Sequence, residues 1–255
     1  MRYPLTPAPS VCLTARGWQG ANSTTERLRS WGFNSLGGWS ATVAERAGAA
    51  RGLYYAHLLD MGTTWLRHNG LDHDPWSAAF AQQCAAVAAA QVAPRATDEH
   101  LLGWQLDNEL AWPQLGLAHF LGVSSEGQAQ AVGYLRKEYH TIGALNAAWG
   151  CKAASFAALG KALTPAVQAS KAFQADNNEW LGVVAAQYFD VATAAVKKHD
   201  PHHLILGMRG GVFCSDDHCS AQLPIIRATA KYVDVFDYHS CTTTCHSALS
   251  FGTAI

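Results

Sequence analysis

The sequence carries little charge and has no concentration of positive charge. Charged residues make up 15% of its 255 residues, and the formal net charge is -1 at pH 7. Because no stretch is rich in lysine and arginine, nucleic acids and anionic membrane surfaces are poor candidates for partners. The sequence also lacks a Gly-rich loop of either common phosphate-binding type, which argues against a nucleotide-dependent enzyme.

Long apolar runs are missing as well. A transmembrane helix needs about 18 or more consecutive apolar residues, and no such run is present. The first residues, MRYPLTPAPSVCLTARG, lack the apolar core of a signal peptide. If Met1 is the true start, a cytoplasmic location is expected. The sequence gives no indication of the oligomeric state.

What the sequence does contain is enough apolar material for one sizeable core. Hydrophobic residues make up 49% of the chain, and no linker or internal repeat divides it. We therefore expect a single domain over residues 1–255. The nine tryptophans and eight tyrosines suit a protein that stacks sugar rings, and they equally suit a well-packed core.

Strand-like and helical segments alternate along the chain. Short apolar runs predict strands at 11–15, 33–39, 53–59, 101–107, 204–208 and 233–238. Apolar spacings of three and four predict helices at 24–31 (with Ser23 as N-cap), 42–51, from 74 onward, 125–140, 141–149, 171–199 and 221–231. This alternation predicts a parallel sheet with right-handed helical crossovers.

The most informative stretch is HLLGWQLDNELAW at residues 100–112. Its apolar run predicts a buried parallel strand, which ends in Asp107, Asn108 and Glu109. In a (β/α)8 barrel the carboxyl ends of the strands form the active-site face, so Glu109 is a candidate general acid. In a glycosidase the Glu protonates the leaving oxygen, and the Asn108 amide hydrogen-bonds the sugar 2-hydroxyl. The alternative interpretation is a strand that ends in a polar turn.

Five motifs occur in the order found in clan A glycoside hydrolases. They are WGFNSLGGWS (31–40), GWQLDNELAW (103–112), YLRKEYHTIGALNAAWG (134–150), HDPHHLILGMR (199–209) and VDVFDYHS (233–240). Over roughly residues 25–240 the sequence resembles the β-galactosidases of glycoside hydrolase family 42 and the β-agarases of family 50. The resemblance implies a (β/α)8 barrel, a carbohydrate substrate and a retaining mechanism. It also implies that Glu109 is the acid/base residue and that Tyr238 ends the sixth strand, where a tyrosine supports the nucleophile.

One expected residue is missing from this pattern. The resemblance implies a nucleophilic Glu at the end of a seventh strand, but the last Glu is Glu179, in a predicted helix. Three accounts remain open: a fragment of an active enzyme, a non-catalytic carbohydrate-binding relative, or an Asp acting as nucleophile. Asp237 is the best-placed Asp, although strand alternation predicts that it points away from the barrel interior. We favour a fragment, an incomplete barrel of about six strands that is inactive by itself.

Three further side chains are candidates for substrate binding. Trp39 ends a predicted strand, Arg209 follows one, and Trp112 follows the Asn-Glu pair. A tryptophan ring can stack on a sugar, and an Arg at a strand end suits sugar hydroxyls or a carboxylate. Core packing is the alternative for both tryptophans.

Three polar or aromatic residues are assigned to structure instead. Trp104, inside the strand, is expected to pack in the core, and His57 to be a hydrogen-bonded core histidine. Asp107 is expected to alternate away from the barrel interior and to fix the strand end by hydrogen bonds.

Four of the seven cysteines fall in the last 42 residues: Cys214, Cys219, Cys241 and Cys245, with His218, His239 and His246 among them. Free thiols are the favoured interpretation. A disulfide and a structural zinc site are the alternatives, but the cysteine spacings differ from the usual two-residue spacing of zinc ligands. No cofactor is expected.

Overall fold

The computed structural model describes residues 15–62, 71, 73–108, 110, 112–211 and 223–239. Its strands are β1 (Ser35–Leu36), β2 (Tyr54–Leu58), β3 (Leu101–Gln105), β4 (Leu204–Ile205), β5 (Gly210–Gly211) and β6 (Tyr238–His239). Its α-helices are α1 (Ala15–Ser30), α2 (Thr42–Ala49), α3 (Ala78–Val87), α4 (Leu117–Gly122), α5 (Glu126–Tyr139), α6 (Ile142–Trp149), α7 (Pro165–Gln168), α8 (Lys171–Lys197) and α9 (Leu223–Thr229). Shorter helical turns are η1 (Ala88–Val92), η2 (Ala93–Arg95), η3 (Trp112–Leu115) and η4 (Phe156–Ala162).

The strands form parallel sheets, as the alternation of segments predicted. A four-stranded sheet has the order β1-β2-β3-β4, and β5 pairs with β6 in parallel. Backbone hydrogen bonds from Asp234 N and Val235 N to Ile205 O, at 2.9 and 3.2 Å, join the segment before β6 to β4. Within each sheet the strands run in one direction, so their carboxyl ends lie at one edge of that sheet.

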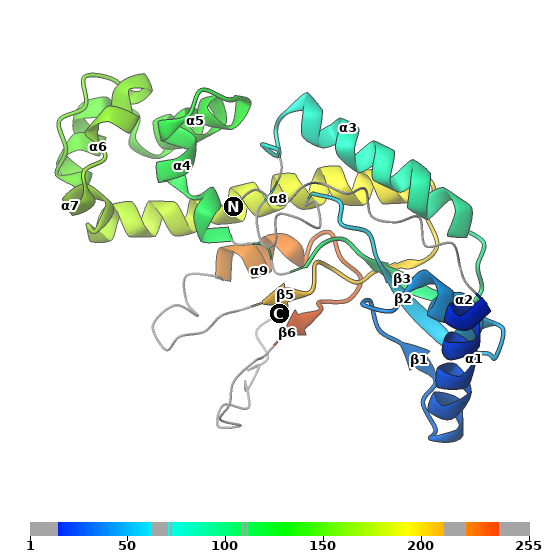
Figure 1. Ribbon diagram of the computed structural model, residues 1–255. Helices are drawn as coiled ribbons and strands as arrows, with labels where there is room; N and C mark the ends of the chain where they lie inside the picture. The colour runs from blue at the N-terminus through cyan, green and yellow to red at the C-terminus, as the bar shows by residue number, and fades with distance from the viewer. Residues whose placement is uncertain are drawn as a thin grey trace, which may run out of the picture.

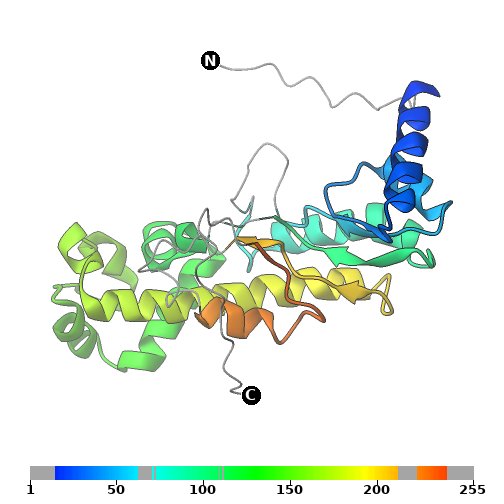
Figure 2. The same cartoon turned by 90° about the horizontal axis from the view of Figure 1, so that it is seen from below.

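Helices connect successive strands and cover the sheet. Figure 1 shows α8 crossing the molecule with α3 on one side and α9 on the other, while α1 and α2 lie at the β1 end. The segments α4 to α7 form a helical arm at the other end of α8, and Figure 2 shows the same elongated arrangement from below. Among the helices of the described ranges, none combines the length and apolar character that crossing a membrane requires.

Helix α8 supplies much of the core. Trp180, Val184 and Tyr188, which follow one another at spacings of four, are fully buried, because this spacing places them on one side of the helix. Trp180 stacks on Trp76 at a ring distance of 5.3 Å. The long helix therefore connects the sheet with the helical arm through one continuous aromatic core.

The N-terminal prediction was wrong where the structure describes it. Ala15, expected in a strand, begins α1, and Ser23, expected as an N-cap, is an exposed residue inside that helix. The helix begins earlier than predicted because one of its faces, which includes Ala21 and Thr25, is buried. Helix α1 also packs against α2, and such packing stabilises a helix. Residues 11–14 lie outside the described residues.

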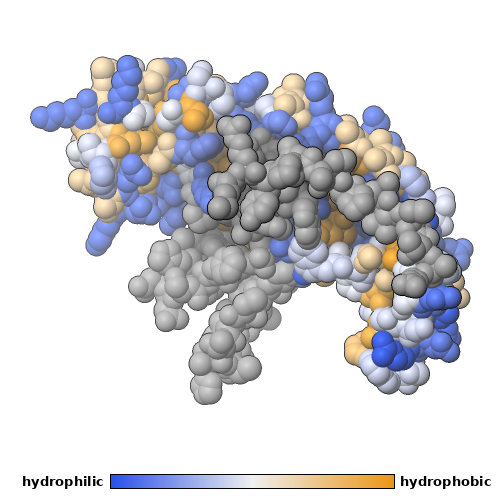
Figure 3. Space-filling view, in the orientation of Figure 1, coloured by the Kyte–Doolittle hydropathy of each residue, from blue (hydrophilic) through white to orange (hydrophobic). Residues whose placement is uncertain are grey.

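The predicted strand at 233–238 is also shorter than expected, since only Tyr238 within it pairs as a strand. Along the described ranges the four-stranded and two-stranded sheets do not merge into one closed sheet. The α/β class with a parallel sheet is confirmed, and the incomplete (β/α)8-type barrel of about six strands stays a prediction. Figure 3 shows hydrophilic and hydrophobic residues interspersed on the surface around α1 and α2. Trp31 and Phe33, which follow α1 in the chain, are exposed.

Candidate active site

Several polar and aromatic side chains meet at the carboxyl ends of the strands. We call this group the strand-end site; its members are Gly38, Trp39, Gln105, Asn108, Arg209 and Asp237. Each follows a strand, ends one or directly precedes one. Parallel strands present their carboxyl ends at the same edge of a sheet, and this edge is where α/β enzymes place their catalytic residues.

Arg209 connects two of the predicted site residues. Its Nε donates a hydrogen bond to Asn108 Oδ1 at 3.0 Å, and its guanidinium carbon lies 5.5 Å from the centre of the Trp39 ring. This distance is within the range of a cation–π interaction. The Trp39 side chain is 53% exposed. The structure therefore brings together three residues that the sequence singled out separately.

The backbone at Arg209 is unusual. Its φ of 48° lies in the left-handed region, which residues other than glycine rarely adopt. The neighbouring Gly207 has a φ of 84°. Backbone conformations of this kind are found disproportionately at functional sites, where the surrounding contacts hold them in place.

Gln105 and Asp237 form the other half of the strand-end site. Gln105 Nε2 donates a hydrogen bond to Asp237 Oδ2 at 2.5 Å. The expectation that Asp237 points away from the site was wrong, because residues 233–237 are not a regular strand and do not alternate. A Cβ added to Gly38 would lie 1.6 Å from Gln105 Oε1 and 3.5 Å from an Arg209 terminal nitrogen. A glycine at position 38 is what lets the two halves of the site approach each other.

The sequence interpretation did not single out Gln105 or Gly38. A glutamine as the last residue of an otherwise apolar strand was the available signal, since a polar side chain there needs a partner. Its partner, however, is 132 positions further along the chain.

Trp112 is a core residue, so the predicted role of this ring as a sugar platform is corrected. Its side chain is 2% exposed, and it stacks on Phe189 and meets Tyr188 edge-on at ring distances of 6.3 and 5.7 Å. A sugar needs an open aromatic face, and both faces of this ring lie among buried neighbours. The Trp112 ring packs against the aromatic residues of α8 because burying a large aromatic side chain is strongly favourable.

Asp107 fixes the position of the strand end, as predicted. The carboxylate is fully buried, and its Oδ2 accepts hydrogen bonds from Gly62 N at 2.9 Å and from the Tyr188 hydroxyl. It thus joins the loop after β2, the end of β3 and helix α8. Burial raises the pKa of Tyr188 well above its ordinary value, and the charge of Asp107 raises it further.

Trp104 and His57 are also confirmed as structural residues. Trp104 Nε1 donates to Asp200 Oδ2 at 2.8 Å. The pKa of Asp200 is lowered: burial acts to raise it, but hydrogen bonds from the His203 backbone, Trp104 and other groups outweigh burial. His57 is buried and lies within hydrogen-bond distance of Glu45 and Gln91, at 2.9 and 3.0 Å.

Some predicted residues are beyond what the structure describes. Glu109 lies outside the described residues, and for Tyr238 only the backbone, paired with Gly210, is described. The four late cysteines, Cys214, Cys219, Cys241 and Cys245, also lie outside the described residues. Their state, and with it the choice between thiols, a disulfide and zinc, stays a prediction.

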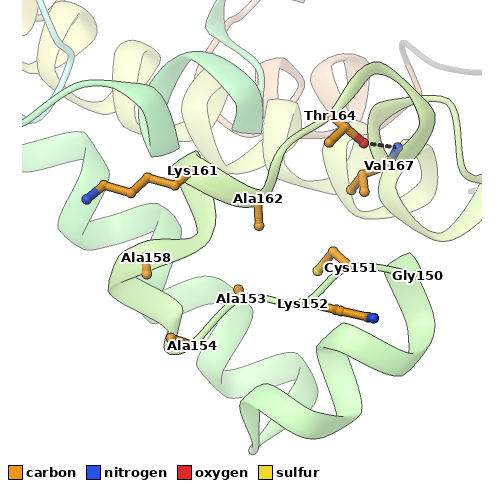
Figure 4. A pocket seen from close by; sticks show the side chains of 10 residues that line it. All are labelled: Gly150, Cys151, Lys152, Ala153, Ala154, Ala158, Lys161, Ala162, Thr164 and Val167. Carbon is orange, nitrogen blue, oxygen red and sulfur yellow. Dashed lines mark hydrogen bonds between the residues drawn. The ribbon is translucent and has the colours of Figure 1, made fainter.

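A separate cavity of about 500 Å³ lies in the helical arm, between α6 and α7. Figure 4 shows it lined by alanine side chains, with the amino groups of Lys152 and Lys161 pointing in opposite directions. Among its described lining residues there is no carboxylate, so they do not supply the pair of carboxyl groups that glycoside hydrolysis uses. The strand-end site is therefore the better candidate for chemistry.

Comparison with known proteins shows a relationship to agarases. No family model matches the sequence. The chain is 30% identical over 243 residues to β-agarase A of Vibrio sp. (strain JT0107), and 27% identical over 235 residues to β-agarase B of the same organism. Each alignment covers 85% of this chain and 23% or 24% of the relative. The chain thus spans about a quarter of the length of these curated relatives.

Solved structures give the same relationship. The crystal structure of an agarase, AgWH50C, matches 86% of this chain and 32% of its own, with a TM-score of 0.69 and 26% identity. A β-galactosidase from the psychrophilic Marinomonas ef1 matches 87% of this chain and 38% of its own, with a TM-score of 0.58 and 15% identity. The second match concerns the fold alone. The resemblance to clan A glycoside hydrolases is confirmed, with β-agarases as relatives in sequence and a β-galactosidase as a neighbour in fold.

Proposed function

We propose that this chain supplies the sugar-binding face and the acid/base residue of a glycoside hydrolase that acts on β-galactoside polysaccharides, agarose among them. The observation that carries the proposal is the contact of Arg209 with both Asn108 and Trp39 at the carboxyl ends of parallel strands. An exposed aromatic ring beside an amide and a guanidinium suits a sugar, which presents apolar C–H faces and hydroxyl edges.

The Arg209 contact also orients the Asn108 amide. Because Oδ1 accepts from the guanidinium, the amide nitrogen becomes the group that can donate to a substrate oxygen. This is the orientation required if Asn108 is to hydrogen-bond the sugar 2-hydroxyl. The next residue in the chain, Glu109, is proposed as the acid/base residue of a retaining mechanism, in which two carboxyl groups lie about 5–5.5 Å apart.

A second candidate function is carbohydrate binding without catalysis. It is favoured by one observation, the absence of any Glu after Glu179 in the 255 residues. The two functions share the strand-end site and differ only in turnover. Binding therefore tests what they have in common.

The test is the affinity of agarose oligomers for the chain carrying Trp39→Ala, compared with Trp31→Ala. Both tryptophans are exposed, at 53% and 66%, but Trp31 precedes β1 whereas Trp39 follows it. Loss of one stacking ring is expected to weaken binding by about tenfold or more in Trp39→Ala, with no change in Trp31→Ala. Equal affinities for the two variants, measured by calorimetry, would remove Trp39 from the proposed site.

A further inference from the structure

Gln105 keeps one hydrogen-bonding atom without a partner inside the strand-end site. Its side chain is 6% exposed, its Nε2 donates to Asp237, and its Oε1 has no hydrogen-bond partner among the residues that the structure describes. The amide cannot simply be turned over, because Oε1 would then face the Asp237 carboxylate and oppose it. A buried acceptor without a donor is unfavourable, and such atoms in folded proteins usually mark a position that a ligand or water fills.

We infer that Asp237 and Gln105 together accept hydrogen bonds from the hydroxyl groups of a bound galactoside, and so determine which hydroxyls the site recognises. Both groups offer oxygen acceptors, and the Arg209 guanidinium close by offers donors. A sugar hydroxyl can donate to one and accept from the other. This inference rests on the proposed function, since it names the groups that hydrogen-bond to the sugar hydroxyls at that same site.

The unpartnered Gln105 Oε1 is buried and lies next to the backbone of Gly38. A Cβ at Gly37 would meet nothing within 4 Å. A Cβ at Gly38, by contrast, would overlap Gln105 Oε1. A site built to hydrogen-bond a hydroxyl rejects an analogue that lacks it, because the acceptors are then left unpaired.

The experiment uses methyl β-galactoside and its four monodeoxy analogues as probes, with affinities for the chain measured by NMR titration. For the unmodified chain, at least one deoxy analogue is expected to bind about tenfold more weakly than the parent sugar. In Asp237→Asn and Gln105→Leu the parent sugar should bind more weakly, and the same analogue should lose no further affinity. Such non-additivity shows that the residue and the hydroxyl contact each other.

Gly38→Ala provides a second variant should either of the first two fail to fold. It keeps both polar groups but displaces the Gln105 amide, so it should reduce the same discrimination, while Gly37→Ala should leave it unchanged. A merely structural role would weaken all five sugars equally.

The inference is overturned if every variant retains the unmodified chain's preference among the five sugars, or loses affinity for all of them equally. If Trp39→Ala impairs oligomer binding while this preference is unaffected, the proposed function stands and only the inference fails. If the unmodified chain binds none of the sugars, both are wrong.

Discussion

At the residue scale, one buried carboxylate organises the end of β3. Asp107 is held by Gly62 N from the loop after β2 and by the Tyr188 hydroxyl from α8. An ionised carboxylate without water is tolerated only where hydrogen bonds replace its hydration. The contacts of Asp107 hold the polypeptide directly before Asn108, and thereby set the position of the strand-end site.

The Tyr188 hydroxyl predicts how stability depends on alkaline pH. Its folded-state pKa is raised, first by burial and then by Asp107, so its contribution is complete below the pKa of the unfolded tyrosine and is lost as pH rises above it. Tyr188→Phe is expected to lower the free energy of unfolding by about 1–3 kcal/mol at neutral pH. It should also reduce the decline in stability above about pH 10.

Urea unfolding from pH 7 to 11 measures both effects. Tyr54→Phe is the matched control, because Tyr54 is 50% exposed and should leave stability and its pH dependence nearly unchanged. A Tyr188→Phe variant with the same alkaline slope as the unmodified chain would contradict the assignment.

At the element scale, the sheet depends on a close approach of β3 and β4. A Cβ at Gly103 would lie 2.5 Å from the backbone oxygen of Leu204, and Gly103 pairs with Leu204 in the parallel register. The obstacle is a backbone atom of a neighbouring strand, which cannot move without disturbing the ladder. Glycine at this position is thus a requirement of strand pairing.

Gly103→Ala is therefore expected to destabilise the fold by about 1–3 kcal/mol or more, as overpacking does. The control is Gly133→Ala in the exposed part of α5, where an added Cβ meets nothing within 4 Å. That variant should be stabilised by about 0.5–1 kcal/mol, because alanine favours the helix over glycine. Thermal unfolding of the two variants checks the difference, and a stable Gly103→Ala chain would refute the strand spacing described here.

At the scale of the whole molecule, the number and placement of carboxylates limits the chemistry. Asp190 lies in α8, and Asp200 lies three positions after the last residue of that helix. Asp237 is the one aspartate that the described residues place in the strand-end site, and its Oδ2 accepts from Gln105. A retaining glycosidase needs an acid/base and a nucleophile on opposite sides of the sugar.

We predict that a polypeptide of residues 1–255 binds agarose oligomers but does not hydrolyse aryl β-galactosides faster than its Glu109→Gln variant. Without the nucleophile that forms the covalent intermediate, the rate of hydrolysis falls by several orders of magnitude even though the acid/base residue is present. Product release from aryl glycosides is the measurement, with Asp237→Asn as a further control. Activity that exceeds the Glu109→Gln control and disappears in Asp237→Asn would show that Asp237 acts as the nucleophile.

The sequence by itself determined the features that depend on residues near one another in the chain. The apolar runs of β2 and β3 and the buried stripe of α8 were predicted because strand and helix periods appear directly in the order of residues. Gly150 ends α6 with a φ of 69°, as a glycine after a helix does. The motifs around Asn108 likewise predicted the resemblance to clan A glycoside hydrolases, which the comparisons confirm.

Only the tertiary structure decided which candidates share a site. Arg209 and Asn108 are 101 positions apart, and Gln105 and Asp237 are 132 apart; no local pattern encodes such pairs. Trp112 lies in the core because Phe189 of α8 stacks on it. Asp237 points toward Gln105 because its segment is not a regular strand. Side-chain direction at a strand end depends on the neighbouring strands and helices, and their positions follow from packing of the whole chain.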